Sequence, residues 1–304
     1  MLVRLLNVTF IVFLCALFAL SSLSVRAEFV VSHRVPALVA TTYYDYYVDL
    51  LKLAMERTRP QYGDYRFEGV PSDASTLRAL SDVVQNAYPN LVLEMGYEDK
   101  LTETGDLTYI NFPVDGGIVG YRICYLNPAI QKKITASTTL NDLRKYSIGQ
   151  GVGWADTAVF RHNGFKVIEV DSFPGLFRMV AAGRIDLFCR GANQIIEDSY
   201  ELKALEDSLQ TKNPTKLIVD NTFVFVYPLP RFFYLHNKNT LAKERITAGL
   251  QLAYADGSLK KLWIKHYKAS VDFVNLQHRQ VFHLENPLLK NLPPDYKQYF
   301  FEPL

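Results

Sequence analysis

Histidine, cysteine, serine and carboxylate residues give this sequence few arrangements suited to catalytic chemistry. None of its six histidines has metal-ligand spacing on one helix face, and the nearest pair, His278 and His283, lies five residues apart. No Gly-x-Ser-x-Gly turn is present, and no cysteine lies in a stretch that would activate it. Glu94 with Glu98, or with Asp115, could form a carboxylate pair, although such pairs also arise by chance. We therefore predict that the protein is not an enzyme and has no catalytic residues, metal or cofactor.

A cation at the end of a predicted strand points to ligand binding instead. Arg190 directly follows the apolar run 185–189, and Asn193 lies three residues further on. In an open α/β sheet the carboxyl ends of the strands face the ligand crevice, so both residues are candidates for ligand contact. The alternative for Arg190 is a surface ion pair with Glu197 or Asp198.

Glycines and a tryptophan stand at a second strand end. Gly151 and Trp154 occupy the point where the strand predicted at 147–153 runs into a helix. Glycine permits close backbone approach, and a helix N-terminus favours an anion. Trp154 either stacks against the ligand or packs in the core, and Asp156 can also act as an ordinary helix cap. The sequence here does not continue as a phosphate-binding loop, because no Lys-Ser/Thr pair follows.

Other candidate ligand contacts lie in the part of the chain before residue 123. Tyr43 and Tyr44 follow the first predicted strand and could present rings and hydroxyls to a cleft. Tyr97 and Lys100 follow the third predicted strand, so we expect them near the same cleft.

Two further arginines have two open interpretations each. Arg78, on the second predicted helix, serves either the ligand or a surface salt bridge. Arg122, which follows the glycines at 116, 117 and 120, contacts the ligand or braces a hinge.

Strand-like and helix-like patterns alternate along the chain, which favours an α/β fold with mostly parallel sheets flanked by helices. Strands are predicted at 29–39, 65–70, 90–94, 147–153, 165–170 and 185–189, and helices at 46–57, 75–87, 140–143, 156–163, 173–182, 241–255 and 258–267.

Two long extended stretches, 107–126 and 217–227, interrupt this alternation and suggest crossings between two lobes. We expect lobe 1 to comprise residues 28–117 and 229–304, and lobe 2 to comprise residues 118–228. The last forty residues are expected to wrap over lobe 1. Two lobes joined by two crossings form a clamp with a cleft between them.

The N-terminus and the composition indicate an exported protein that does not bind nucleic acid. Arg4 precedes an apolar run at 7–20, and Val25-Arg26-Ala27 is typical of a cleaved signal peptide, so residues 1–27 are expected to be removed. Loss of Arg4 and Arg26 leaves 31 basic residues against 31 acidic ones, without the positive excess that general nucleic-acid binding requires. We expect a periplasmic monomer.

Two cysteines remain in the mature chain, Cys124 and Cys189. They are 65 positions apart, a spacing that carries no information about pairing. Both lie in strand-like runs, and we expect buried free thiols.

Several stretches of the sequence resemble family 3 of the solute-binding proteins, the periplasmic components of polar amino-acid transporters. The resemblance covers roughly residues 29 to 290, and the most similar branch is uncharacterised and divergent. It implies a two-lobed, type II binding-protein fold in which each lobe closes on a small molecule. The stretches that carry the resemblance are Leu140-Asn141-Asp142-Leu143, Ile148-Gly149-Gln150-Gly151, Met179-Val180-Ala181-Ala182-Gly183-Arg184-Ile185-Asp186 and Ala255-Asp256-Gly257-Ser258-Leu259-Lys260-Lys261-Leu262-Trp263.

The sequence departs from this family where the family holds its ligand. Amino-acid binders carry an Arg after the third strand that clamps the ligand carboxylate, whereas here Lys100 is the nearest cation. The family also places an acidic residue near Asp186 for the α-ammonium, whereas here Arg190 occupies that neighbourhood. An anionic or several-oxygen ligand therefore fits better than an ordinary zwitterion.

These observations predict a protein that captures a small polar ligand, anionic or amino-acid-like, for an ABC permease. Two alternatives stay open. One is a sensor or adaptor module that docks to a membrane partner, and the other is a dehydratase or lyase on the same fold.

Overall fold

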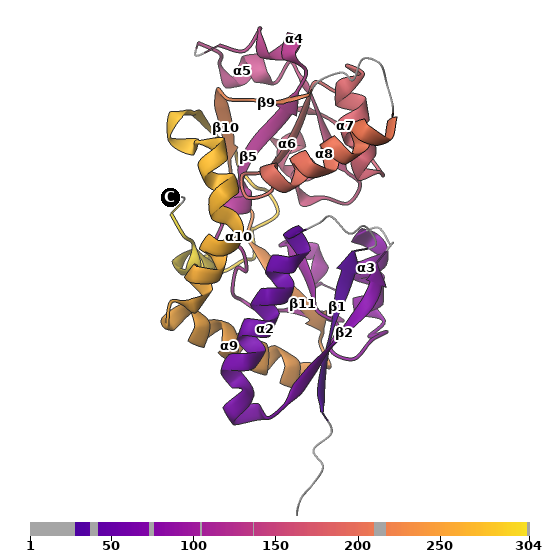
Figure 1. Ribbon diagram of the computed structural model, residues 1–304, viewed down its shortest axis with the longest axis vertical. Helices are drawn as coiled ribbons and strands as arrows, with labels where there is room; N and C mark the ends of the chain where they lie inside the picture. Colours follow the sequence, from indigo (N-terminus) through magenta and orange to yellow (C-terminus); the bar gives the residue numbers. More distant parts are fainter. Residues whose placement is uncertain are drawn as a thin grey trace, which may run out of the picture.

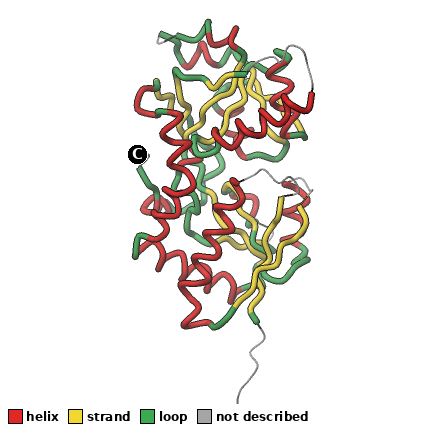
Figure 2. The backbone as a smooth tube through the Cα atoms, viewed as in Figure 1, coloured by secondary structure: helices red, strands yellow, loops and turns green. Residues whose placement is uncertain are grey.

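The computed structural model describes residues 28–36, 42–72, 76–103, 105–135, 137–209 and 217–302. Two lobes lie one above the other along the long axis, each with strands inside and helices outside (Figures 1 and 2). The lower body, which contains β1 and β2, is called lobe 1, and the upper body, which contains β5, is called lobe 2. The predicted export signal lies outside the described residues.

Lobe 1 contains a parallel strand pair and a short antiparallel sheet. β1 (Phe29–Pro36) pairs with β2 (Tyr65–Ser72) in parallel. The antiparallel sheet has the strand order β3-β11-β4. An isolated bridge between His33 and Val92 connects the two groups of strands. The members of the antiparallel sheet are β3 (Leu93–Gly96), β11 (Arg231–His236) and β4 (Leu107–Tyr109).

The helices of lobe 1 bury the apolar positions that the sequence spacing predicts. Leu50 and Leu51 of α2 (Thr42–Tyr62) are buried, and α2 packs against α9 (Thr240–Ala255). A β-carbon on Gly249 of α9 would lie 2.0 Å from the carbonyl oxygen of Ala54, so this close helix packing requires glycine. The short α3 (Thr76–Val84) covers the other side of the lobe and packs against β11 and β3.

Lobe 2 is built on one sheet, in the order β12-β10-β5-β8-β6-β7, with β9 beside β5. β6 is parallel to β7 and β8, but β5 runs antiparallel to β8, β9 and β10, so the sheet is mixed and not mostly parallel. β5 enters lobe 2 from lobe 1, and its direction is therefore opposite to that of the strands beside it. The strands are β5 (Tyr121–Leu126), β6 (Ser147–Gly151), β7 (Lys166–Val170), β8 (Leu187–Gly191), β9 (Ile218–Val219), β10 (Phe223–Val226) and β12 (Gln280–His283).

Helices cover both faces of the sheet in lobe 2, and apolar side chains fill both layers. Val159 and Phe160 of α6 pack with Ile148 and Leu187 on one face. On the other face, residues of α7 pack with Phe188. The helices of this lobe are α4 (Pro128–Gln131), α5 (Leu140–Leu143), α6 (Ala155–His162), α7 (Phe173–Ala181) and α8 (Ile195–Leu209).

The two cysteines of the described chain form a disulfide, which corrects the expectation of free thiols. Cys124 and Cys189 lie opposite each other in the antiparallel pair β5–β8, and both are fully buried. Burial was predicted correctly. The pairing depends on the register of two strands, which the sequence spacing does not reveal.

The chain passes between the lobes at β4–β5 and at β10–β11, and these two crossings touch. Tyr227 N–H donates to the carbonyl of Gly120, and a β-carbon on Gly120 would lie 2.3 Å from the Tyr227 oxygen. Gly116 and Gly117 adopt left-handed conformations with φ of 64° and 84°. The two crossings are therefore in contact at Gly120.

The C-terminal part of the chain lies against both lobes, not over lobe 1 alone. Helix α10 (Ser258–Val274) extends from lobe 1 upward beside lobe 2 (Figure 1). After η3 (Leu276–His278), β12 pairs in parallel with β10 of lobe 2. The chain then returns, and Tyr296 of η4 (Pro294–Tyr299) packs in the core of lobe 1.

Candidate functional site

The strand ends of lobe 2 meet lobe 1 at two close contacts. A β-carbon on Gly96, at the end of β3, would lie 3.5 Å from the Ala155 side chain at the start of α6. A β-carbon on Gly153 would lie 3.6 Å from Leu77 in α3. The loop between β6 and α6 therefore faces the end of β3 and the start of α3. This is the region in which the sequence placed a ligand site.

Gly151 and Trp154, both predicted as site residues, lie directly against each other. The indole ring of Trp154 covers Gly151 so closely that a β-carbon there would lie 2.4 Å from the ring. The ring is partly buried and packs near Phe173 and Phe188. The glycine is therefore required by the tryptophan ring above it.

Arg190 lies in the same cluster, where an acidic side chain holds it. Its guanidinium carbon is 5.0 Å from the centres of the Trp154 and Phe173 rings. Its Nε donates to Asp198 Oδ2 at 2.7 Å, and a second nitrogen donates to the other carboxylate oxygen at 3.3 Å. Only 12% of the Arg190 side chain and 7% of the Asp198 side chain are exposed. Burial raises the pKa of the Asp198 carboxyl, and the charge of Arg190 opposes that rise. The ion pair with Asp198 exists, but it is internal and not at the surface.

Arg122 holds the two crossings together. One nitrogen donates to the Val119 carbonyl at 3.1 Å, and another lies 2.8 Å from Asp156 Oδ1. The Tyr227 hydroxyl donates to the same carboxylate oxygen. Burial, followed by the charge of Asp156, raises the pKa of Tyr227 well above its ordinary value. Because Val119 and Tyr227 belong to different crossings, these contacts connect the two crossings through Arg122 and Asp156.

Two buried amides at neighbouring strand ends have hydrogen-bonding capacity that no described residue uses. Gln150 of β6 is fully buried, and Asn193, just after β8, is 1% exposed. In neither side chain does the amide oxygen or nitrogen have a partner among the described residues. β6 and β8 are parallel neighbours, so both amides lie at the carboxyl edge of the sheet. An unsatisfied buried polar group costs about 1–3 kcal/mol, so this arrangement is costly to the fold.

Gln150 was not predicted, although its signal was in the sequence. It is a polar residue between two glycines in the second half of the strand, at a position that is buried, and a buried polar residue normally requires a partner. Thr157, in the first turn of α6, adds a buried hydroxyl with no partner among the described residues.

Lobe 1 contributes three charged side chains close to the first crossing, those of Arg231, Glu94 and Asp115. Arg231 lies 3.6 Å from the Glu94 carboxylate and also donates to the Glu94 carbonyl. Asp115 is fully buried, and its Oδ1 accepts the Gly117 N–H at 3.0 Å. Burial raises the pKa of Asp115 to about 6, and Arg231 opposes that rise. Burial also raises the pKa of Glu94.

The remaining predicted site residues lie apart from this cluster. Tyr97 is in the core of lobe 1 beside the Tyr109 and Phe232 rings, and burial raises its pKa to about 12. Lys100 is exposed and pairs with Glu98 at 2.7 Å.

Arg78 is also exposed and lies 3.3 Å from Asp82, one turn along α3. Tyr43 and Tyr44 belong to the first turn of α2, and their side chains lie outside the described residues.

Neither a metal centre nor a membrane-spanning helix is found in the described part of the chain. No three histidine, cysteine or carboxylate side chains come together there in a way that could hold a metal ion. No helix within the same ranges combines the length and the apolar character needed to cross a bilayer.

No family model and no curated protein matches this chain.

Comparison with solved structures gives matches over most of the chain at low identity. The GluR0 ligand-binding core in complex with L-glutamate is 10% identical, covers 80% of this chain and 99% of that one, and has a TM-score of 0.57. The amino-acid ABC transporter substrate-binding protein AbpA from Streptococcus pneumoniae, bound to L-arginine, is 12% identical over 81% and 96%, with a TM-score of 0.51. A histidine kinase sensor domain with similarity to periplasmic binding proteins is 14% identical over 79% and 96%, with a TM-score of 0.53. The chain thus has the two-lobed α/β fold of the periplasmic binding proteins.

Proposed function

We propose that this protein is an exported solute-binding protein that holds a small polar molecule between its lobes. Residues 1–27 act as the export signal and residues 118–228 form most of lobe 2. Residues 28–117 and 229–304 form lobe 1, except for β12 (Gln280–His283), which joins the sheet of lobe 2. The observation that carries the proposal is the pair of buried amides of Gln150 and Asn193 at the carboxyl ends of β6 and β8. A bound solute would give these amides the donors and acceptors that the chain itself does not supply.

The chemistry of the site favours an amino-acid-like ligand without excess negative charge. Arg190 was the main reason to expect an anion, but its guanidinium is paired with Asp198. Arg122 is paired with Asp156 in the same way. Amide groups donate and accept hydrogen bonds equally well, so they suit zwitterions and uncharged polar groups. The solved structures of this fold include proteins bound to L-glutamate and to L-arginine, which supports amino acids as the first class to test.

Closure of the lobes is proposed to occur about the two touching crossings. Arg122 connects Val119 of the first crossing to Asp156 of α6, and Tyr227 of the second crossing reaches the same carboxylate. The ends of the crossings would therefore move with lobe 2 as one body. Ligand would shift the lobes toward the closed arrangement by its higher affinity for that arrangement.

Delivery to an ABC permease is one proposed use of the bound solute, and signalling is the second. The second use is favoured by the histidine kinase sensor domain among the structures with this fold. Purification of the protein from membranes would separate the two, because an ABC permease or a sensor kinase would accompany it. Unchanged recovery of the solute after incubation is expected in both cases, and a converted solute would indicate a lyase.

A thermal-shift screen of the mature chain tests the proposal. Amino acids should raise the melting temperature, and dicarboxylates, small phosphates, sugars and polyamines should raise it less. A ligand at about a hundred times its Kd adds about 2.7 kcal/mol to the free energy of unfolding. X-ray scattering with the best amino acid should then show compaction. The proposal would be overturned if no compound at about 1 mM, a concentration that as a Kd corresponds to about −4.1 kcal/mol, changed the melting temperature.

A further inference from the structure

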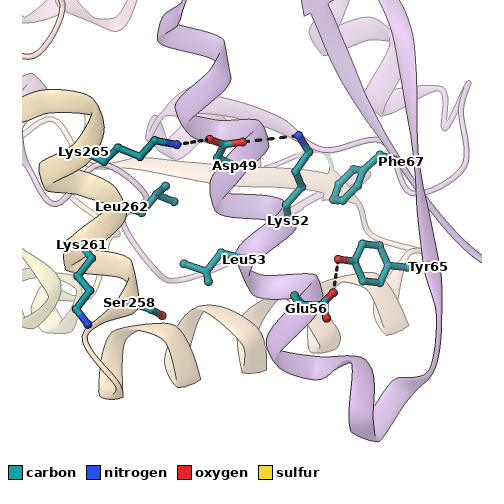
Figure 3. Close-up of a pocket in the computed structure, with 10 residues that line it drawn as sticks. All are labelled: Asp49, Lys52, Leu53, Glu56, Tyr65, Phe67, Ser258, Lys261, Leu262 and Lys265. Atoms are coloured by element: carbon teal, nitrogen blue, oxygen red, sulfur yellow. Dashed lines mark hydrogen bonds and ion pairs between the residues drawn. The ribbon is translucent and has the colours of Figure 1, made fainter.

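A second concave surface lies on lobe 1, away from the strand ends that carry Gln150 and Asn193. It is a groove of about 670 Å³ between α2, α10 and β2 (Figure 3). This volume is within the range of sites that bind small molecules. None of the side chains that line the groove belongs to the candidate site described above. A ligand in this groove would therefore be independent of the one between the lobes.

The floor of the groove is apolar. Leu53 of α2 and Leu262 of α10 point into the space between the two helices, and Phe67 of β2 closes one side (Figure 3). All three side chains are partly buried against the main core cluster. A hydrocarbon chain along these residues would remove apolar surface from water on both sides.

One end of the groove has more cationic groups than carboxylates. Lys52 Nζ and Lys265 Nζ lie 3.6 Å and 3.5 Å from the Asp49 carboxylate, and His266 Nε2 lies 3.2 Å from it. A single carboxylate is thus shared by three nitrogen groups. Lys52 and Lys265 are 55% and 69% exposed, so an incoming anion could reach both without displacing a buried group.

The other acidic side chain of the groove already has its own partners. Glu56 accepts a hydrogen bond from the Tyr65 hydroxyl at 2.9 Å and lies 3.4 Å from Arg59. Its charge is therefore directed away from the Lys52 end. Lys261 lies further along the α10 side of the groove and adds to the positive charge there.

We propose that this groove binds a single-chain anionic amphiphile, an acyl carboxylate. Its head group would lie beside Lys52 and Lys265, which share the single Asp49 carboxylate, so that one more carboxylate would balance the two ammonium groups. Its chain would lie along Leu53, Leu262 and Phe67. A free amino acid suits this surface poorly, because the floor offers nothing to its polar atoms. An acidic peptide shares the charge but would leave most of its backbone polar groups unpaired on an apolar floor.

The experiment is titration calorimetry of the mature protein with sodium decanoate below its micelle concentration. Binding is expected to strengthen about fourfold for each methylene added between hexanoate and decanoate, following the transfer free energy of a CH₂ group. Decanol has the same chain without the charge and should bind at least about tenfold more weakly. Added salt should weaken decanoate but not decanol.

Paired variants locate the site. The double variant Lys52→Ala/Lys265→Ala should weaken decanoate at least about tenfold. The matched control is Lys260→Ala/Lys268→Ala, which removes the same charge from exposed positions outside the groove and should leave binding unchanged. Trp154→Ala, in the interlobe cluster, should also leave decanoate binding unchanged, which separates this proposal from the solute-binding one.

Four results would overturn the proposal. They are absence of decanoate binding at 1 mM (a Kd weaker than about 1 mM), equal affinity for decanol, equal loss in the control double variant, and binding of an acidic peptide at the groove without binding of decanoate.

Discussion

The Ser270 hydroxyl of α10 donates a hydrogen bond of 2.7 Å to the carbonyl of Ala192, the residue before Asn193. The same oxygen accepts the N–H of Ile196 in the first turn of α8. A serine of the C-terminal helix therefore caps a helix of lobe 2 and fixes the loop that carries one of the two unsatisfied amides. Because α10 packs on α2 and α9 as well, this contact connects the loop to lobe 1.

Replacement of this serine should destabilise the protein more than its size suggests. Ser270→Ala would leave the Ala192 carbonyl and the Ile196 N–H without their partner at a site that is 3% exposed. We expect a loss of about 1–3 kcal/mol in the free energy of unfolding, measured by urea denaturation. Ser199→Ala is the matched control, because the Ser199 hydroxyl is exposed and bonds only within α8. Equal losses in the two variants would contradict a capping role for Ser270.

The Gln150 side chain should lower the stability of the ligand-free protein and increase its affinity for the ligand. Gln150→Leu keeps the volume of a buried side chain and removes two polar atoms that have no partner among the described residues. We expect the ligand-free protein to gain about 1 kcal/mol or more, while affinity for the best amino acid of the thermal screen falls at least about tenfold.

The control for this variant is Gln85→Leu, at an exposed amide that donates to Ser81. It should change neither quantity by more than about 0.5 kcal/mol. Unchanged affinity in Gln150→Leu would remove Gln150 from the site.

The pair formed by Arg190 and Asp198 should behave as one buried unit. Arg190→Met leaves a carboxylate uncompensated in a cluster of aromatic rings, so we expect a loss of about 3–5 kcal/mol. Adding Asp198→Leu removes that carboxylate and should restore at least half of the loss.

An exposed pair with a similar distance provides the comparison. Arg59 and Asp64 are 2.8 Å apart but more than half exposed, so Arg59→Met should destabilise the protein far less than Arg190→Met does. A cost for Arg190→Met as small as that for Arg59→Met would mean that the charge pair is hydrated in solution.

The order of helices and strands was predictable because it rests on local periodicity. The spacing of Leu50 and Leu51 predicted α2, and the glycine after residue 163 marked the end of α6. The predictions that failed concern contacts between segments that are far apart in the sequence. The pairing of β12 with β10, the antiparallel course of β5 and the partner of Cys124 all depend on segments far apart in sequence.

The candidate site shows the same division. The position of Arg190 at a strand end was predictable, but its enclosure by Asp198 depends on how α8 packs on the sheet. Tyr97 follows a strand as predicted, yet its ring packs with Phe232 of β11, a strand that the sequence pattern did not predict. The sequence marks Gln150 as a polar residue in a strand, but only the packed fold shows that its amide has no partner among the described residues.

The disulfide predicts both the thiol reactivity of the protein and a loss of stability when its cysteines are replaced. Cys124 and Cys189 are both fully buried, so neither should react with a thiol reagent in the folded, oxidised protein. The double variant Cys124→Ala/Cys189→Ala should lose about 4 kcal/mol of unfolding free energy on the chain-entropy account for a separation of 65 residues. Because a buried free thiol would also be unreactive, the thiols of these two residues are counted after denaturation without reductant, and two reactive thiols would show that the bond does not form.

Stability should decrease as the pH rises through the range in which Asp115 ionises. Burial raises the folded-state pKa of this carboxyl from 3.8 to about 6, so between these values the folded protein binds more protons than the unfolded chain. The free energy of unfolding therefore falls with rising pH in this window, by about 3 kcal/mol for two pKa units, and is constant above it. Glu94 and Asp198, whose pKa values are also raised by burial, act in the same direction.

Asp115→Asn isolates the contribution of this carboxyl. The asparagine oxygen can still accept the Gly117 N–H, and the backbone carbonyl that accepts the Trp263 indole N–H is unchanged. The variant should be more stable than the parent at pH 7, and its stability should depend less on pH between about 4 and 6. Asp82→Asn, at a carboxylate paired with exposed Arg78, is the matched control and should leave the free energy of unfolding at pH 7 close to the parental value. If the stability of Asp115→Asn followed the parental pH profile, Asp115 would be solvated, and the pH dependence would then have to be assigned to Glu94 and Asp198.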